Sequence, residues 1–529
     1  MQNVNSTLSA KTMKWVCGAP VTERIVWGFV VIGVLLRLRQ FTFDRSLWLD
    51  ESALALNIIQ RSPTELLKPL DINQGAPLGF LLLEKLAISS FGSSEMALRL
   101  LPFVCGIVSI FLFKAVADRF LKPTVVPIAV GLFVVLDPLI YYSAEAKQYS
   151  SDVAVALLLY LLGDSLLDAP LRLKRTVVFS MIGAIAIWFS HPAVFILAAS
   201  GISLVWASLH NNDRPSLVIL SVPGVLWFGS FLVSYLVSVR SLSNNANLLA
   251  YWQGAFPPVP FSFAADGHWF VASFFDLFCN SVGLKMMGIA AATAILGACT
   301  FFSEHRARFL LLLAPAAFTL LASALHRYPF SGRLLLFLVP SIILLISGGF
   351  GTIRMKTRES LPLLSVLLIG LLCFYPVVYA GFFFINPRTK EEIKPIIEYV
   401  RNHRVKGDIL YLYYSSALAF EYYSERHLIE PIDEIVGRSQ EDMKFFRKDL
   451  DDLRGKGRVW ILFSHVYPGE FRASGTVTPA PYSNPNGIKF DEERLFLDYL
   501  DGMGKRLDFA QAPGACVYLF DLGVKPHYN

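Results

Sequence analysis

Long apolar segments dominate the first 385 residues of the chain. A helix needs about 20 mostly apolar residues to span the hydrocarbon core of a bilayer. Segments of this kind lie at 22–38, 96–116, 123–142, 152–168, 176–190, 192–208, 216–239, 282–302, 308–325, 333–350 and 361–385. We divide the run between 176 and 208 at His191-Pro192, because proline interrupts a helix. The pattern predicts a polytopic α-helical membrane protein with about eleven transmembrane helices.

The last 144 residues have a different pattern. They carry 42 of the 88 charged residues, and their apolar runs at 408–414, 458–465 and 515–520 are short enough to be buried strands. Helical patterns occupy 388–403, 434–454 and 491–503. We therefore predict a transmembrane domain over 1–385 and a C-terminal soluble α/β domain over 386–529, with a parallel or mixed sheet. This domain could recognise an acceptor, cover a site or act as a structural cap.

Basic residues in the short loops predict the orientation. With the N-terminus in the cytoplasm, the short inner loops carry eleven Lys and Arg and the outer side carries four, as the positive-inside rule requires. The C-terminal domain is then extracytoplasmic, together with outer loops at 40–95, 143–151 and 241–281. Arg37 and Arg39 follow the first apolar segment without a small-residue cleavage site, which argues against a cleaved signal peptide. We expect an integral protein of the plasma (inner) membrane.

Composition excludes several classes of protein. Apolar residues make up 54% of the chain and charged residues 17%, which excludes a disordered or wholly soluble protein. The six cysteines are scattered singly, so neither a disulfide framework nor a zinc site is indicated. The net charge of +6 fits a cytoplasmic-loop bias rather than nucleic-acid binding.

Two of the outer loops carry acidic residues. Asp50 and Glu51 follow Trp48 soon after the first apolar segment, and Glu145 precedes Lys147 and Tyr149 in the second loop. Ionisable groups at a membrane boundary are functional candidates. The structural alternatives are an N-capping role for the acidic pair and an interfacial role for the tyrosine.

Three further candidates are basic or weakly basic. His191 interrupts two apolar segments, where it either caps a helix or contacts a substrate. Arg327 and Arg333 lie at the expected headgroup level, and guanidinium groups suit bidentate phosphate binding. Snorkelling toward the membrane surface is the alternative for both arginines.

Five short motifs follow one another along residues 20–390. They are Trp48-Leu49-Asp50-Glu51, Ala76-Pro77, Arg99-Leu100-Leu101-Pro102, Tyr142-Ser143-Ala144-Glu145-Ala146-Lys147-Gln148-Tyr149 and Gly332-Arg333. In their order and spacing they resemble the C-type glycosyltransferases, and among them the family 39 type, which includes protein mannosyltransferases and the lipid A aminoarabinose transferase. The resemblance implies a membrane enzyme that moves a sugar from a polyprenyl-phosphate carrier to an acceptor on the outer face, usually with inversion.

The resemblance also implies roles for individual residues. The first-loop catalytic acid falls on Asp50, with Glu51 beside it, and the second-loop acid falls on Glu145. Lys147 and Gln148 replace the Arg-Pro pair that many relatives have, which keeps one positive charge. Arg327 or Arg333 would hold the carrier phosphate. A histidine that many relatives have before the proline of the first-loop turn is absent from Gly75-Ala76-Pro77.

The chemistry of transfer is consistent with these residues. An acceptor hydroxyl must lose a proton as it attacks, and Asp50 is our choice of general base. The phosphate leaving group needs stabilisation of its charge by Arg, Lys or a divalent cation. Asp50, Glu51 and Glu145 would hold such a cation if one is present. The expected partners are a polyprenyl-phosphate-linked sugar, a glycan, lipid or protein acceptor and membrane lipids, but no nucleic acid.

Other functions fit parts of the pattern. A lipid-linked oligosaccharide flippase or another transporter would use the arginines as a pathway, but transporters place ionisable groups near the bilayer midplane. A polymerase that joins lipid-linked repeat units differs from the predicted enzyme only in its acceptor. A sensor with an outer domain would not need acids in two loops.

Overall fold

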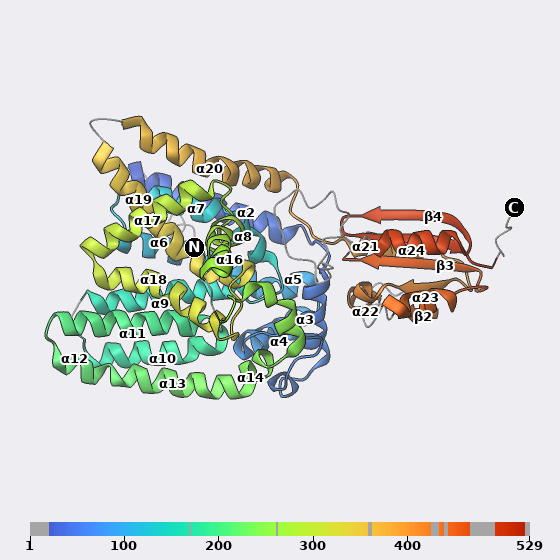
Figure 1. Cartoon of the computed structure of the whole chain (residues 1–529), viewed down its shortest axis with the longest axis horizontal. Helices are drawn as coiled ribbons and strands as arrows, with labels where there is room; N and C mark the ends of the chain where they lie inside the picture. The colour runs from blue at the N-terminus through green and yellow to red at the C-terminus, as the bar shows by residue number, and fades with distance from the viewer. Residues whose placement is uncertain are drawn as a thin grey trace, which may run out of the picture.

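The structure, a computed structural model, describes residues 21–168, 171–260, 263–357, 362–424, 433–437, 443–465 and 492–523. A bundle of helices forms the larger part, and a small sheet domain projects from one end of it (Figure 1). The N-terminal residues 1–20 and the stretch 466–491 lie outside the described residues.

Short 3-10 helices (η1, η2, η4, η6) and π-helices (η3, η5) interrupt the α-helices of the bundle. The elements of this part are α2 (Val21–Thr42), α3 (Leu49–Gln60), η1 (Glu65–Leu67), α4 (Leu78–Phe91), α5 (Glu95–Leu98), α6 (Leu100–Phe120), α7 (Val126–Val135), α8 (Asp137–Tyr141), η2 (Tyr142–Ala144), α9 (Tyr149–Leu167), α10 (Leu173–Phe189), α11 (Ala193–His210), α12 (Arg214–Ile219), α13 (Ser221–Ser234), η3 (Tyr235–Val239), α14 (Arg240–Ser243), α15 (Ala246–Tyr251), η4 (Gln253–Ala255), α16 (Phe263–Asp276), η5 (Leu277–Val282), α17 (Met287–Glu304), α18 (Arg306–Ala324), η6 (Gly332–Leu338), α19 (Val339–Thr357) and α20 (Pro362–Ile385).

Each of the eleven predicted apolar segments is helical. Eight helical segments of the described chain are long and apolar enough to cross a membrane, and a ninth results if α7 and the bent segment after it count as one span. The other two predicted segments are α2 and α10. Helix α10 has 17 residues, about 26 Å at 1.5 Å per residue, which is slightly short of a bilayer core of about 30 Å. The predicted membrane fold is therefore confirmed.

Helices α17 and α19 approach each other closely at two glycines. A Cβ atom on Gly297 would lie 1.8 Å from the carbonyl oxygen of Leu345, and one on Gly349 would lie 2.0 Å from that of Thr293. Only glycine permits this separation of the two backbones. Small residues at helix contacts are typical of membrane bundles, where dispersion forces between closely packed helices replace the hydrophobic effect.

A mixed five-stranded sheet forms the C-terminal domain. Its strand order is β2-β1-β3-β5-β4, in which β2, β1 and β3 are parallel and β5 is antiparallel to both β3 and β4. The elements are α21 (Ile393–His403), β1 (Ile409–Leu412), η7 (Tyr414–Ser416), α22 (Ala417–Ser424), β2 (Asp433–Val436), α23 (Met443–Asp451), β3 (Arg458–Ser464), α24 (Glu492–Asp501), β4 (Lys505–Ala512) and β5 (Ala515–Asp521).

The two edge strands are absent from the sequence prediction. Residues 433–436 form β2, whereas the charge pattern of 434–454 predicted helix, and residues 438–442 of that stretch lie outside the described residues. Strand β4 has mostly exposed or half-buried residues. Edge strands bury few side chains, so they lack the continuous apolar run that identified the central strands.

Two separate apolar cores lie on the two faces of the sheet. Residues of α23 and α24 pack on one face, together with Phe463 and Phe520. The core on the other face is continuous with the segment after the first span, because Ile396 and Trp460 of the domain share it with Leu54 and Phe80. The domain is thus packed against α3 and α4, at the edge of the bundle that faces it (Figure 1).

Candidate active site

Asp50 lies in the first turn of α3, where the free N–H groups of a helix favour a negative charge. Its carboxylate forms an ion pair with Arg333, which stands in η6 at the beginning of a late span. Gln74 donates a hydrogen bond to Asp50 Oδ1 at 3.3 Å, and Lys147 Nζ lies 3.6 Å from the same oxygen. The Asp50 side chain is 22% exposed. Asp50 of the first loop, Lys147 of the second loop and the late Arg333 thus meet at one point.

Charges around Asp50 keep it ionised. Burial alone would raise its pKa, but Lys147 and Arg333 outweigh this effect and hold the pKa well below its usual value of 3.8. Burial lowers the pKa of Lys147, and Asp50 opposes that change. In this arrangement Asp50 is a weak base whose cationic partners would also attract a phosphate.

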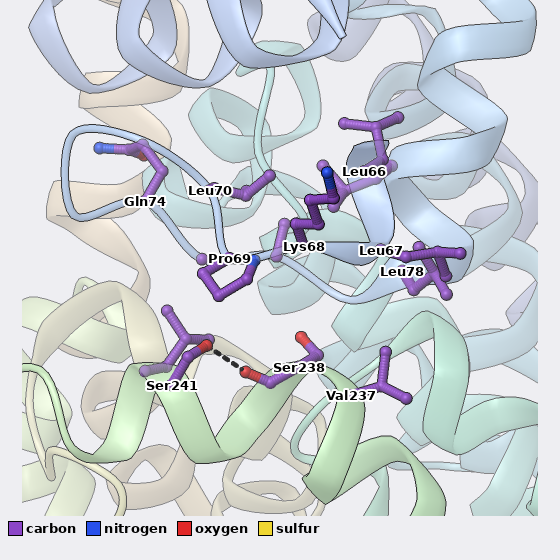
Figure 2. Close-up of a pocket in the computed structure, with 14 residues that line it drawn as sticks. Leu66, Leu67, Lys68, Pro69, Leu70, Gln74, Leu78, Val237, Ser238 and Ser241 are labelled. Carbon is purple, nitrogen blue, oxygen red and sulfur yellow. Dashed lines mark hydrogen bonds between the residues drawn. The ribbon is translucent and has the colours of Figure 1, made fainter. Parts of the chain in front are cut away.

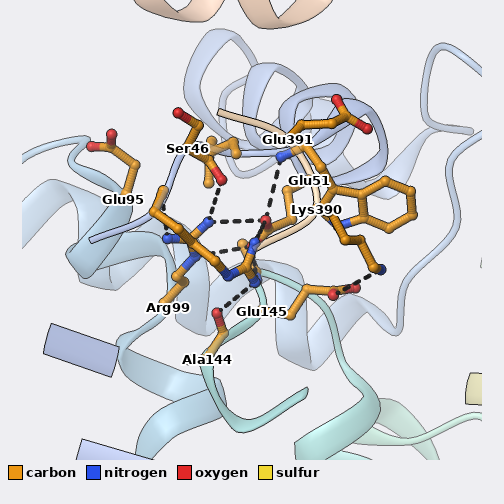
Figure 3. Close-up of polar contacts among 12 residues, drawn as sticks. Ser46, Glu51, Glu95, Arg99, Ala144, Glu145, Lys390 and Glu391 are labelled. Atoms are coloured by element: carbon orange, nitrogen blue, oxygen red, sulfur yellow. Dashed lines mark hydrogen bonds and ion pairs between the residues drawn. The ribbon is translucent and has the colours of Figure 1, made fainter. Parts of the chain in front are cut away.

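Glu51, by contrast, is fully buried. Arg45 Nη1 donates to its carboxylate at 2.7 Å, and Arg99 donates from Nε and Nη2 at 3.0 and 2.9 Å. The backbone N–H of Ala146 donates at 2.8 Å, and Figure 3 shows Arg99 pointing toward the Glu51 carboxylate. Burial would raise the pKa of Glu51, but the two guanidinium groups lower it. These contacts fix the first loop against the second, so we interpret Glu51 as a residue that positions Asp50.

Glu145 is also buried, and it contacts a residue that follows the last span. Lys390 Nζ donates to its Oε2 at 3.4 Å, and Figure 3 shows Lys390 pointing toward Glu145. The ammonium group lies 3.7 Å from the ring centre of Trp48. Trp48 in turn has the guanidinium of Arg333 at 5.1 Å from its ring centre. Lys390, which pairs with Glu145, and Arg333, which pairs with Asp50, therefore both lie next to the Trp48 ring.

Tyrosines complete this region. The Arg333 guanidinium lies 5.6 Å from the ring centre of Tyr149, and that ring packs edge-on against Tyr142 at 5.3 Å. Partial burial raises the pKa of the Tyr251 hydroxyl in α15; the charge of Arg333 opposes this change and that of Asp50 reinforces it. Aromatic rings beside cations suit a sugar that carries a phosphate.

Two sequence-predicted residues have other partners. Arg327 donates to the backbone and side chain of Ser243 and to Asn244, so it fastens the loop that follows α14. His191 lies half-buried between α10 and α11, and its buried Nε2 has no hydrogen-bond partner among the described residues. The contacts of the described residues link neither side chain directly to Asp50.

Four residues near the site are not singled out by the sequence pattern. Gln74 lies in the turn before Ala76-Pro77, for which the sequence leaves a loop role and a ligand-binding role equally open, and Trp48 serves there only to describe the position of the acids. Lys390 and Arg388, whose guanidinium lies 4.8 Å from the ring centre of Tyr141, belong to the stretch that leads into the C-terminal domain. Their basic character was the one available signal, and it is common in soluble domains.

A groove reaches the site beside Gln74. It runs between the first loop, including Leu66 and Pro69, and the helix that carries Val237 and Ser241 (Figure 2). Gln74 lines the groove and accepts a hydrogen bond from Lys147 at 2.5 Å, so its amide separates the groove from the charged cluster.

The three acids proposed as metal ligands do not converge. Asp50 pairs with Arg333, Glu51 with Arg45 and Arg99, and Glu145 with Lys390. No group of three His, Cys, Asp or Glu side chains among the described residues is arranged to hold a metal ion. We therefore derive no step of the chemistry from a metal.

Comparison with solved structures shows the fold. Neither a protein-family model nor a curated protein sequence matches this chain. The crystal structure of ArnT from Cupriavidus metallidurans bound to undecaprenyl phosphate is 12% identical, covers 94% of this chain and 98% of its own, and has a TM-score of 0.54. The crystal structure of the same protein in the apo state is 13% identical, covers 93% of this chain and 98% of its own, and has a TM-score of 0.50.

A second protein gives the same result. The archaeal oligosaccharyltransferase AglB from Archaeoglobus fulgidus, in complex with an inhibitory peptide and a dolichol-phosphate, is 11% identical. The match covers 93% of this chain and 74% of that chain, with a TM-score of 0.50. ArnT and AglB are both glycosyltransferases of the GT-C fold. This chain is therefore an integral membrane protein with the GT-C fold, as its sequence motifs indicated.

Proposed function

We propose that this protein is a membrane glycosyltransferase that moves a sugar from a polyprenyl-phosphate carrier to a hydroxyl group of a glycan, lipid or protein acceptor. The observation that carries the proposal is the contact of the Asp50 carboxylate with Arg333 and Lys147. It combines a base for the acceptor with cations for a phosphate. The fold supports the choice of donor, because one solved neighbour binds undecaprenyl phosphate and another binds a dolichol-phosphate.

The cations around Asp50 give the reaction an order. A phosphate that enters the site competes with Asp50 for Arg333 and Lys147. Loss of these partners removes the main cause of the lowered pKa of Asp50, so its basicity rises when the donor is bound. The donor thus converts a paired carboxylate into a usable base.

Transfer then takes place in one displacement. The acceptor oxygen bonds to the anomeric carbon while its proton passes to Asp50. The bond between that carbon and the phosphate oxygen breaks, and the phosphate oxygen keeps the electron pair. Arg333 and Lys147 stabilise the charge that develops on this oxygen. Attack opposite the leaving group inverts the configuration of the sugar.

The remaining candidates have supporting roles in this proposal. Glu51 positions Asp50 through its buried arginines, and Glu145 orients a cation of the site. Tyr149 supports Arg333. His191 is a candidate contact for the sugar, and Arg327 holds the loop after α14 against the site. We place this site on the extracytoplasmic face, with the N-terminus in the cytoplasm.

The test is the substitution Asp50→Asn in the full-length protein in nanodiscs. A panel of undecaprenyl-phosphate sugars is supplied with an envelope extract, and release of undecaprenyl phosphate is measured. A positioned base contributes about 10²- to 10⁴-fold, so Asp50→Asn should lower turnover by that factor while the protein remains folded. The control is Asp44→Asn, whose side chain is 47% exposed and pairs with Lys394. Turnover by Asp50→Asn within a few-fold of wild type would exclude Asp50 as the base.

A further inference from the structure

Residues 386–392, which we call the linker, join the last span to the C-terminal domain and are fastened to the first loop. The backbone N–H and carbonyl of Arg388 pair with the side chain of Gln40 at 3.1 and 2.8 Å. Glu392 accepts from the backbone and hydroxyl of Ser46 at 3.2 and 2.9 Å. Glu391 accepts from the backbone N–H of Leu49, next to Asp50, at 3.2 Å. The linker is thus held beside the candidate active site at several points.

The sheet domain contributes to this placement. Ser464 at the end of β3 donates to Glu391 at 3.1 Å, and His465 contacts the same carboxylate. The His465 ring also stacks on Trp48, with 6.0 Å between ring centres. Because the apolar core beneath α21 and α22 is continuous with α3 and α4, the domain and the linker form one packed unit with the first loop.

This arrangement holds Lys390 in an aromatic cage, which we define as Trp48, Tyr141 and Tyr142. The ammonium nitrogen lies 3.7, 5.0 and 5.6 Å from the three ring centres. The guanidinium of Arg388 lies 4.8 Å from the Tyr141 ring centre on the same side of the site and pairs with Asp137. Cations over aromatic faces are stabilised without using their hydrogen-bond donors.

Buried polar atoms of the cage and of its neighbours Arg333 and Glu145 point to a ligand. Trp48 Nε1, Tyr141 Oη, Arg333 Nε and Glu145 Oε1 are all buried and have no hydrogen-bond partner among the described residues. Buried polar groups of native proteins are normally paired. Three of these atoms are donors, and each belongs to a side chain in contact with Lys390 or with Trp48. Donors of this kind match the oxygens of an anion.

The charge of the region also favours an anion. Lys147, Arg333, Arg388 and Lys390 supply four positive charges, and Asp50, Asp137 and Glu145 supply three negative charges, which leaves a net charge of +1. A phosphate that bears one or two negative charges therefore fits better than a neutral sugar alone. Planar arginines and a compact ammonium are the groups that commonly bind phosphate.

We propose that Lys390, supplied by the linker of the C-terminal domain, is a ligand of the phosphate of the polyprenyl-phosphate donor. The proposal rests on the proposed function, because that function defines the donor. When the phosphate enters, Lys390 exchanges Glu145 for a phosphate oxygen, while Trp48 Nε1 and Arg333 Nε donate to the same group. The C-terminal domain is then part of the donor site rather than only a cover.

The ionisation of Lys390 gives the proposal a pH signature. Burial lowers the pKa of Lys390 to about 8; Glu145 opposes this change, whereas Arg333, Arg388 and Arg45 reinforce it. Lys390 is charged below this value and loses its charge as the pH rises through it. Affinity for a phosphate should therefore fall above about pH 8. Arginine at this position stays charged at all these pH values, so Lys390→Arg should flatten the profile.

The experiment measures binding of undecaprenyl phosphate to the full-length protein in nanodiscs, from pH 6.5 to 9.5. Undecaprenol, which has the same tail without the phosphate, and inorganic phosphate are the comparison ligands. We expect Lys390→Ala to weaken binding of undecaprenyl phosphate about 10- to 100-fold near pH 7, as for loss of a hydrogen bond to a charged group. The control is Lys394→Ala, four residues further on, whose ammonium pairs with Asp44 and Glu95.

The outcomes separate this proposal from the proposed function. Equal binding of undecaprenyl phosphate by wild type and Lys390→Ala would overturn the role of Lys390. If the thermal midpoint shows that Lys390→Ala is not folded, Lys390→Arg takes its place. Identical pH profiles of undecaprenyl phosphate binding for wild type and Lys390→Arg would then overturn the role of Lys390. Wild-type binding of undecaprenol as tight as that of undecaprenyl phosphate would instead refute the polyprenyl-phosphate donor itself. Inorganic phosphate that binds as tightly as the lipid would show a site for free phosphate and overturn the proposal.

Discussion

The network around Glu51 makes a strong prediction about stability. The side chains of Glu51, Arg45 and Arg99 are 0%, 1% and 2% exposed. The negative charge of Glu51 therefore compensates the positive charges of both arginines in a place that water does not reach. Five donors point at the two carboxylate oxygens, three from the arginines and two from the backbone N–H groups of Ala146 and Trp48. Glu51→Gln keeps the shape of the side chain, but it removes the charge and turns an NH₂ donor toward guanidinium donors.

The magnitude follows from the burial of the partners. Removal of one member of a buried ion pair costs about 3–5 kcal/mol, because the remaining charges stay in the interior without compensation. At about 1.4 kcal/mol per factor of ten, the equilibrium between folded and unfolded protein shifts roughly 200- to 5,000-fold. With about 2 °C per kcal/mol for a large domain, the thermal midpoint should fall by about 6–10 °C.

The assay is a thermal melt of detergent-purified protein followed by size-exclusion chromatography. The matched control is Glu398→Gln, which removes a carboxylate that is 61% exposed and pairs with Arg401. Exposed pairs contribute about 0–1 kcal/mol, so this variant should melt within about 2 °C of wild type. A Glu51→Gln protein that melts together with the control would refute a stabilising role for the buried network.

Two further predictions concern packing and pH. Gly349→Val should separate α17 and α19, because its Cβ would lie 2.0 Å from the Thr293 carbonyl oxygen. We expect it to destabilise the protein by about 1–3 kcal/mol and to lower the midpoint of the thermal melt. The control Gly370→Ala, whose Cβ would have no atom within 4 Å, should not lower the midpoint. Because the pKa values of Asp50 and Glu51 are lowered from 3.8 and 4.5, the stability that their ionisation provides is complete above about pH 4.5 and is lost as the pH falls further. Melts from pH 7 to 3 should therefore show a falling midpoint that is weaker in Glu51→Gln; equal pH dependence of the two proteins would contradict this linkage.

The sequence predicted most of the membrane fold because lipid imposes a simple requirement. A segment that crosses the bilayer must be apolar and helical, so local composition alone identifies it. The central strands β1, β3 and β5 were identified for a similar reason, since each is buried as a continuous apolar run. The edge strands β2 and β4 have no such requirement, and their residues do not distinguish them from helix or loop.

The sequence by itself determined that this chain is a membrane protein, that its helical part resembles the GT-C enzymes and that Asp50, Glu145 and Arg333 are candidate site residues. Only the tertiary structure decided that Glu51 is enclosed by Arg45 and Arg99, and that Lys390 lies beside Trp48 from 342 positions along the chain. Adjacent residues such as Asp50 and Glu51 have the same local sequence context. Their different environments arise from segments that are distant in the chain and meet only when the helices and the C-terminal domain pack together.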